Sequence, residues 1–209
     1  MIIGLSGYAK SGKDTVAEII REIQPDKWQI KKFSGKLKTI ASIMLGIPEY
    51  LFENQDFKSE ILGEEWWKNY GDFYHQTTVR DFLQLLGTDA IRNGLHSNAW
   101  VNALMADYKP TNEPKMVLDN GVKVYDIDSP DFKMPNWIIT DCRFPNEAEA
   151  IKDRGGIIIR IDRPGVEPVN AHPSEIALDN WDFDYKIANV SDLPALKQTV
   201  EVLLNKIPC

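Results

Sequence analysis

The chain has 209 residues, of which 43% are hydrophobic and 26% charged, and its formal net charge is -7 at pH 7. This length suits a single domain over residues 1–209 with a sizeable core. The acidic balance argues against broad binding to nucleic acid or to an acidic membrane surface. We see no secretory leader and no run long enough to cross a bilayer, and the spacing of Cys142 and Cys209 indicates reduced thiols, not metal ligands. We therefore expect a cytoplasmic protein.

The first element in chain order is a short apolar run, Ile2–Ser6, which is typical of a buried parallel strand. The sequence GYAKSGKD follows at residues 7–14 and matches the glycine-rich phosphate loop G-x-x-x-x-G-K, with Asp14 where Ser or Thr is usual. The next segment has one apolar helical face, made by Val16, Ile19, Ile20 and Ile23, and Pro25 ends it. Strand, glycine loop and helix are the context that the motif requires, so the sequence predicts a nucleotide-phosphate site.

The chemistry of this loop follows from its residue types. Gly7 and Gly12 let successive N–H groups turn toward an anion, and the following helix adds the positive end of its dipole. Lys13 supplies a positive charge for the transferring phosphate. Asp14 is a hard oxygen ligand that suits Mg²⁺ and can bind it directly or through water. Alternatively, Thr15 binds the metal. A third possibility is that Asp14 only stabilises the first helical turn.

In the middle of the chain, the sequence predicts a second strand at residues 28–33 and then a mostly helical region at 34–107. Its best-defined helix covers residues 79–91 and begins with a capping pair, Thr78 and Asp81. Arg80 and Gln84 are four residues apart and therefore share the polar side of this helix. A further helix is expected at 99–108. Residues 109–135 contain four prolines and the turn sequence Asp119-Asn120-Gly121, which predicts an inserted β-hairpin with loops.

The last third of the sequence alternates strands and helices again. We predict strands at 137–140, 156–161 and 185–188, a helix at 146–154, a polar loop at 163–181, and a closing helix at 193–205 begun by Ser191. This alternation indicates an α/β protein whose parallel sheet is covered by helices on both faces.

Several charged residues follow predicted strands, at the sheet edge where open α/β folds bind ligands. Asp141 can hold metal-bound water and Arg143 can grip an acceptor phosphate with its planar fork, although a surface ion pair is the alternative. Arg160 and Arg163 flank the end of a later strand, where arginines can close over transferring phosphates. Ser34, Lys36 and Lys38 follow the second strand and can meet an anion, but Lys36 is as well explained as a solvated residue.

Six segments in order carry a family resemblance: SGYAKSGKDT, FSGKLK, VRDFLQLLGTD, TDCRFPNEAEAI, IRIDRPG and HPSE. In this order and spacing they resemble the bacteriophage deoxynucleoside monophosphate kinases, outside roughly residues 48–75 and 109–135. The family's loop also reads GKDT, so Asp14 is a shared feature. The resemblance implies a three-layer P-loop nucleoside monophosphate kinase fold, with a five-stranded parallel sheet in the order 2-3-1-4-5. It also implies that residues 34–107 form the helical monophosphate-binding region.

The resemblance further implies that the enzyme transfers the γ-phosphoryl group of ATP to a deoxynucleoside 5′-monophosphate, with Mg²⁺. Catalysis would fall to Lys13, Asp141 and Arg143, and metal binding to Asp14 and Thr15. The ATP-binding residues would be Gly7, Ala9, Lys10, Ser11, Gly12, Lys13, Asp14, Thr15 and Arg163. The monophosphate-binding residues would be Ser34, Lys38, Arg80, Gln84, Asp89, Arg143 and Arg160.

The polar loop 163–181, which includes His172 and Glu175, would form a lid with Arg160 and Arg163, although HPSE can equally begin a helix. Two other functions fit the phosphate loop. One is a different small-molecule kinase of the same fold, acting on dephospho-coenzyme A or phosphomevalonate, and the other is a nucleotide-binding regulatory switch. The inserted segments can also supply a homodimer contact, and a phage-encoded chain would work in the host cytoplasm.

Overall fold

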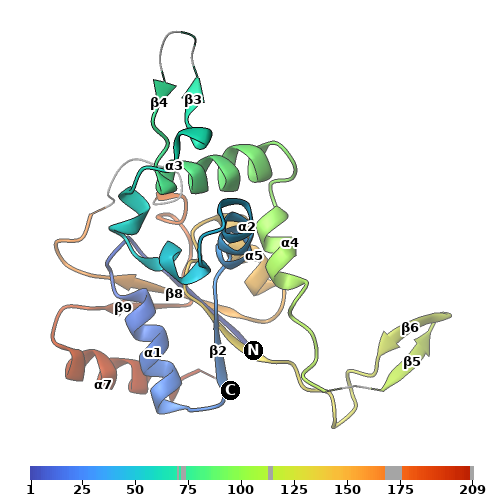
Figure 1. Ribbon diagram of the computed structural model, residues 1–209. Helices are drawn as coiled ribbons and strands as arrows, with labels where there is room; N and C mark the ends of the chain where they lie inside the picture. The colour runs from blue at the N-terminus through green and yellow to red at the C-terminus, as the bar shows by residue number, and fades with distance from the viewer. Residues whose placement is uncertain (70, 72–73, 113–114, 168–175, 208–209) are drawn as a thin grey trace. The chain divides into compact units, whose positions relative to one another are not determined.

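The computed structural model describes residues 1–69, 71, 74–112, 115–167 and 176–207. The chain forms two compact units, and each is described by itself (Figure 1). The first unit consists of Met1–Lys32 and Met105–Cys209, and the second of Phe33–Leu104.

A five-stranded sheet lies at the centre of the first unit. Its strands are β1 (Ile2–Ser6), β2 (Trp28–Lys31), β7 (Asn136–Ile139), β8 (Ile157–Asp162) and β9 (Tyr185–Ala188). Every neighbouring pair is parallel, and the order is β2-β7-β1-β8-β9. Numbered within this sheet, the order is 2-3-1-4-5, as the resemblance implied.

Helices cover both faces of this sheet, which explains why its strands are nearly continuous apolar runs. Helices α1 (Lys13–Ile23) and α7 (Leu193–Leu204) lie together on one face, where Ile3 and Leu5 join their apolar side chains in one core cluster. On the other face, helix α5 (Pro145–Lys152) packs so closely that a Cβ on Gly4 would lie 2.7 Å from Ile151 Cδ1. The α/β three-layer prediction is confirmed.

The first turns of two helices differ in detail from the sequence prediction. Helix α7 is capped by Asp192, whose Oδ1 accepts a hydrogen bond from the Ala195 N–H at 3.1 Å, so the prediction that Ser191 is the cap that begins it was wrong. Both residues are good caps, and only the backbone direction at this point selects between them. Helix α5 begins at Pro145, whose missing N–H is no loss in a first helical turn.

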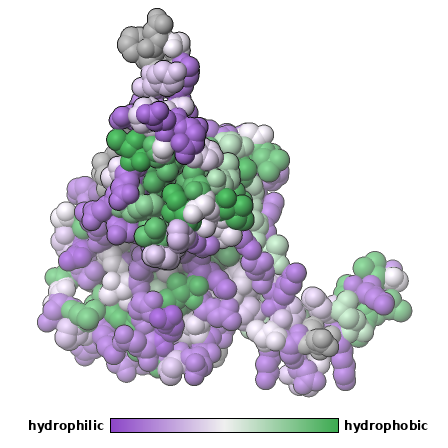
Figure 2. Space-filling view, viewed as in Figure 1, coloured by the Kyte–Doolittle hydropathy of each residue, from purple (hydrophilic) through white to green (hydrophobic). Residues whose placement is uncertain are grey.

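The hairpin predicted within 109–135 is present as β5 (Met116–Asp119) and β6 (Val122–Tyr125). Asn120 and Gly121 have φ angles of 49° and 82°, so both central residues of the turn are left-handed, as a two-residue type I′ hairpin requires. Its apolar side chains face outward: Leu118 is 73% exposed and Val122 is 62% exposed (Figure 2). The hairpin therefore carries an exposed apolar surface.

The second unit is largely helical. Its elements are α2 (Gly35–Leu45), the 3₁₀ turns η1 (Glu49–Glu53), η2 (Phe57–Ser59) and η3 (Glu64–Trp66), strands β3 (Lys68–Asn69) and β4 (Tyr74–His75), α3 (Val79–Gln84), the π-helical η4 (Leu85–Asn93) and α4 (Ala99–Met105). The last residue of α4, Met105, is counted with the first unit. Phe52, Val79 and Phe82 belong to the core cluster of the second unit. The predicted helix at 79–91 is one continuous helical stretch, but it widens after Gln84.

The start of α3 is the capping pair that the sequence predicted. The Asp81 N–H donates to Thr78 Oγ1 at 3.1 Å, while Asp81 Oδ2 accepts from the Thr78 N–H at 3.0 Å and from its hydroxyl at 2.7 Å. The side-chain hydrogen bond from Thr78 is the largest cause that lowers the pKa of Asp81 below 3.8, followed by the backbone hydrogen bond. The carboxylate therefore stabilises the fold fully above pH 3.8, and this contribution is lost as the pH falls through its lower folded pKa.

We expect Thr78→Ala to lower the free energy of unfolding at pH 7 by about 1 kcal/mol, because α3 loses a cap. The deficit should shrink when the pH falls through the pKa of Asp81, because the wild type then also loses the hydroxyl–carboxylate bond. Urea unfolding at neutral and acidic pH measures both effects. Thr78→Ser keeps the hydroxyl and should restore most of the stability. An equal loss in this variant would show that the methyl group matters and not the cap.

Candidate active site

The loop between β1 and α1 has the backbone geometry of an anion cradle. Gly7, Lys10 and Gly12 have φ angles of 146°, 67° and 105°. A Cβ on Gly7 would lie 2.4 Å from the carbonyl oxygen of Ile161, and one on Gly12 would lie 2.7 Å from Asn189 Nδ2. Gly7 is therefore required by conformation and by space, and Gly12 by its left-handed conformation. The loop leads directly into α1, whose N-terminus presents the positive end of its dipole at this point.

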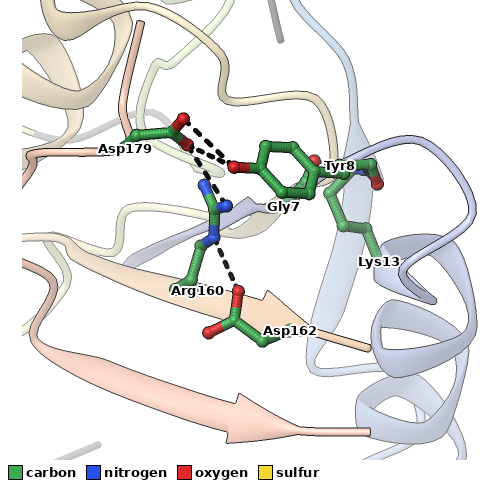
Figure 3. A network of polar contacts seen from close by, with 6 residues as sticks. All are labelled: Gly7, Tyr8, Lys13, Arg160, Asp162 and Asp179. Carbon is green, nitrogen blue, oxygen red and sulfur yellow. Dashed lines mark hydrogen bonds and ion pairs between the residues drawn. The ribbon is translucent and has the colours of Figure 1, made fainter. Parts of the chain in front are cut away.

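The lysine of the motif lies against the loop itself. Lys13 is 9% exposed, and its Nζ donates to the carbonyl oxygens of Gly7 and Tyr8, each at 2.7 Å (Figure 3). A buried ammonium at this point places a full positive charge within the curve of the cradle. An entering phosphate would be a stronger partner for it than a neutral carbonyl.

The two candidate metal ligands lie at the start of α1. Asp14 has a 73% exposed side chain and pairs with Lys32 Nζ at 3.3 Å, and Thr15 is also exposed. Among the described residues, no group of three or more His, Cys, Asp or Glu could hold a metal ion. A carboxylate and a hydroxyl do fit Mg²⁺, which is typically held by one or two protein oxygens together with water and substrate phosphates.

The far end of the loop is held by a residue that the sequence analysis missed. The Asn189 side-chain amide follows β9 and donates to the carbonyl oxygen of Ser11 at 2.9 Å. Ser11 is 1% exposed, and within the described part of the chain its hydroxyl oxygen has no hydrogen-bond partner. Ala9 and Lys10 lie between these points, and the Lys10 side chain is exposed. A lone Asn after a strand has no local signal that would have revealed this contact.

The segment after β7 places Asp141 and Arg143 at the same carboxyl edge as the loop, since β1 and β7 are parallel neighbours. The Cys142 N–H donates to Leu5 O at 3.2 Å, and the Arg143 N–H donates to the buried Glu147 carboxylate at 2.8 Å. Burial raises the pKa of Cys142 well above its ordinary value, so its thiol stays protonated. Asp141 and Arg143 are both partly exposed on this fixed turn.

Arg160 is held by neighbouring protein groups. It is 7% exposed, its Nε donates to Asp162 Oδ1 at 2.9 Å, and its Nη2 lies 3.3 Å from Asp179 Oδ1. The Tyr8 hydroxyl reaches both oxygens of the same Asp179 at 3.1 Å (Figure 3). Burial opposes the charge of Arg160, but the hydrogen bond to Asp162 and the nearby carboxylates outweigh it and raise its pKa.

Arg163 is exposed just beyond β8. His172 and Glu175, which were assigned to the lid, lie outside the described residues. The role of the loop 163–181 as a lid therefore stays a prediction.

Except for Arg143 and Arg160, which lie in the first unit, the candidate monophosphate residues belong to the second unit. Lys38 is 7% exposed on α2 and forms an ion pair with Glu53 at 2.5 Å, and Ser34 precedes the same helix. The Arg80 guanidinium donates to Gln55 Oε1 at 3.4 Å, while Gln84 and Asp89 are exposed.

The widening of the helix after Gln84 affects where Asp89 lies. In an α-helix, a residue five positions on is turned well away, since four residues nearly complete a turn. In the π-helical η4 the hydrogen bonds join residues five apart, so Asp89 stays close to the side of Gln84. The structure thus brings Arg80, Gln84 and Asp89 toward one side of the helical stretch.

The fold and the site together define a P-loop nucleotide kinase: a 2-3-1-4-5 parallel sheet, a glycine loop ending in a buried lysine after β1, and an arginine at the same edge. A family model described as "Deoxynucleotide monophosphate kinase" matches residues 37–200. The chain belongs to the deoxynucleotide monophosphate kinase family, which confirms the resemblance identified from the six segments.

Individual relatives agree with this family. A protein of Acanthamoeba polyphaga mimivirus is 30% identical over 190 residues, which are 85% of this chain and 82% of that protein. The deoxynucleotide monophosphate kinase of Enterobacteria phage T4 is 31% identical over 132 residues, covering 61% of this chain and 47% of the T4 protein. The deoxynucleoside-5′-monophosphate kinase of Escherichia phage T5 is 24% identical over 251 residues, covering 92% of this chain and 90% of the T5 protein.

Family membership makes the chain an ATP-dependent nucleotide kinase and favours the first of the three functions considered from the sequence over a coenzyme A-type kinase or a switch. Within the residues that the structure describes, no helix is both long and apolar enough to span a bilayer.

Proposed function

We propose that this enzyme transfers the γ-phosphoryl group of ATP to a deoxynucleoside 5′-monophosphate, giving the diphosphate and ADP, and that residues 7–15 bind the donor. The observation that carries this proposal is the buried Lys13 ammonium within the curve of the glycine loop, at the sheet edge that also bears Arg143. Two anions must approach each other in this reaction, and positive charge at the meeting point is the chief requirement.

On the donor side, the backbone N–H groups from Gly7 to Thr15 would hold the outer phosphates, and Lys13 would exchange carbonyl contacts for phosphate oxygens. Ser11 offers a buried hydroxyl at the same place. Asp14 or Thr15 would hold Mg²⁺, which, when bound, neutralises charge on the outer phosphates. Arg163, exposed after β8, would approach the donor from the next strand.

On the acceptor side, Arg143 would grip the phosphate of the monophosphate with its planar fork, and Asp141 would orient the water around the metal. The acceptor phosphate oxygen attacks the γ-phosphorus, the bond to the β,γ-bridging oxygen breaks, and ADP leaves, so no covalent enzyme intermediate is needed. We propose that Ser34, Lys38, Arg80, Gln84 and Asp89 line the monophosphate site. For Lys38 this requires phosphate to compete with Glu53 for its ammonium.

A substrate panel tests this function. ADP release should be stimulated by one or more of the four deoxynucleoside monophosphates and should depend on added Mg²⁺. Dephospho-coenzyme A and phosphomevalonate should leave the rate at its background, and the four ribonucleotides serve as the comparison for the sugar. ATP turnover that is indifferent to every added monophosphate would instead support the regulatory switch.

We also propose that the enzyme acts in the cytoplasm, that of the host if the chain is virus-encoded, and needs neither nucleic acid nor a membrane. A homodimer through the exposed apolar hairpin β5–β6 is part of the same proposal. Sedimentation equilibrium of the wild type and of Leu118→Asp tests it: the dimer should be lost in the variant, and a monomeric wild type would overturn it.

A further inference from the structure

Tyr8 follows Gly7 in the phosphate loop, and its side chain binds a residue that is distant in the sequence. Its hydroxyl donates to both carboxylate oxygens of Asp179, 171 residues later, at 3.1 Å each. Burial is the largest cause that raises the pKa of Tyr8, and the contact with Asp179 raises it further, so this hydroxyl remains a donor at neutral pH. The loop is therefore tied to the segment that precedes β9.

Arg160 completes this arrangement from β8. Its guanidinium carbon lies 4.5 Å from the centre of the Tyr8 ring and 5.7 Å from that of Phe183, so aromatic rings contact the cation. Its Nε is bound to Asp162 and its Nη2 to Asp179 (Figure 3). We call Tyr8, Arg160, Asp162 and Asp179 the loop brace. If Arg160 turned away to contact a substrate, Asp162 and Asp179 would lose their cation beside an anion site, which is unfavourable.

The brace reaches the reactive lysine through the backbone of Tyr8. Lys13 Nζ is bound to the carbonyl oxygens of Gly7 and Tyr8, so the position of Tyr8 decides where the ammonium lies. A Tyr8 side chain held at its hydroxyl and at its ring face has little freedom to rotate. The chain of contacts therefore runs from Asp179 and Arg160 through Tyr8 to Lys13.

We propose that Arg160 and Asp179 are positioning residues for the donor nucleotide: through Tyr8 they set the curvature of the phosphate loop and the place of Lys13. This rests on the proposed function of that loop as the ATP site. By this proposal Arg160 acts on the phosphate loop. The sequence resemblance had instead placed Arg160 among the residues that bind the acceptor phosphate.

The first experiment measures ATP binding without monophosphate, by isothermal titration calorimetry. Tyr8→Phe keeps the ring over Arg160 and removes only the hydroxyl, and Asp179→Asn keeps the shape and removes the charge. Each should weaken ATP binding by roughly five- to fiftyfold, as expected for loss of a charge-assisted hydrogen bond. The double variant should be little weaker than the stronger single one, because both changes act on the same hydrogen bond between Tyr8 and residue 179. Unchanged affinity in both single variants would overturn the proposal.

The second experiment separates the two roles of Arg160 by steady-state kinetics. If it positions the loop, Arg160→Lys should raise the KM for ATP several-fold and leave the KM for the monophosphate within about twofold, since lysine lacks the planar fork. If it binds the acceptor, the monophosphate KM should rise instead, and the proposal fails. Arg21→Lys, in the exposed ion pair with Glu18, is the matched control for replacing an arginine by lysine and should change neither KM.

Folding and the underlying function are controlled separately. Thermal unfolding of each variant shows whether it is folded. If Arg160→Lys is not folded, the ATP affinities of the single variants Tyr8→Phe and Asp179→Asn test the proposal. ATP binding by Lys13→Ala tests the loop itself. Wild-type affinity in Lys13→Ala would show that the loop is not the donor site. Weak binding there, with normal binding by Tyr8→Phe and Asp179→Asn, would remove only the loop brace.

Discussion

Replacing Lys13 by alanine should lower kcat by about 10²–10³-fold, the effect typical of losing one charge-stabilising donor at a reacting centre. The reason is geometric: the ammonium is 9% exposed, lies within the loop, and is the only lysine that the motif places there. The γ-phosphoryl group gathers negative charge as it is transferred, and backbone N–H groups alone would then balance it. A coupled assay of ADP formation at saturating substrates measures the loss.

The matched control is Lys197→Ala, which removes an exposed lysine from α7 and should leave kcat unchanged. Thermal unfolding should show that Lys13→Ala remains folded, because the hydrogen bonds lost at Gly7 and Tyr8 are made to carbonyls that water can reach once the side chain is removed. A folded Lys13→Ala enzyme with near-normal turnover would contradict the assignment of residues 7–15 as the donor site.

Replacing Arg143 by alanine should lower kcat/KM for the monophosphate by about 10²–10³-fold, because in the proposed site its planar fork would both neutralise and orient the acceptor phosphate. Its backbone is fixed by the buried Glu147 carboxylate, so the side chain leaves a rigid turn at the sheet edge. ATP binding measured alone should change much less. This pattern distinguishes an acceptor residue from one that acts on the donor loop.

Two variants sharpen this test. Arg143→Lys keeps the charge without the fork, so its kcat/KM should fall between those of the wild type and of Arg143→Ala. Arg21→Ala removes an arginine from an exposed pair with Glu18 and should have no effect. A folded Arg143→Ala enzyme that retains its monophosphate KM and its turnover would exclude Arg143 from the acceptor site.

Motifs with local physical causes were predictable from the sequence. The strand–loop–helix at the N-terminus, the capping pair Thr78 and Asp81, and the Asn120-Gly121 turn are all set by neighbours within a few residues. The strand order and the family came from six segments in order, and both are confirmed. The individual substrate contacts of the predicted site residues stay predictions.

The sequence by itself determined the phosphate loop, its lysine and the three-layer architecture, because glycine conformation and apolar periodicity are properties of adjacent residues. Only the tertiary structure decided that Tyr8 is bound to Asp179, that Asn189 holds Ser11, and that Lys38 pairs with Glu53. The first two contacts join residues more than 170 positions apart, and polar residues in loops carry no periodicity that would reveal a partner. Folding brings them together at the carboxyl edge of the parallel sheet, where the ends of β1, β8 and β9 meet.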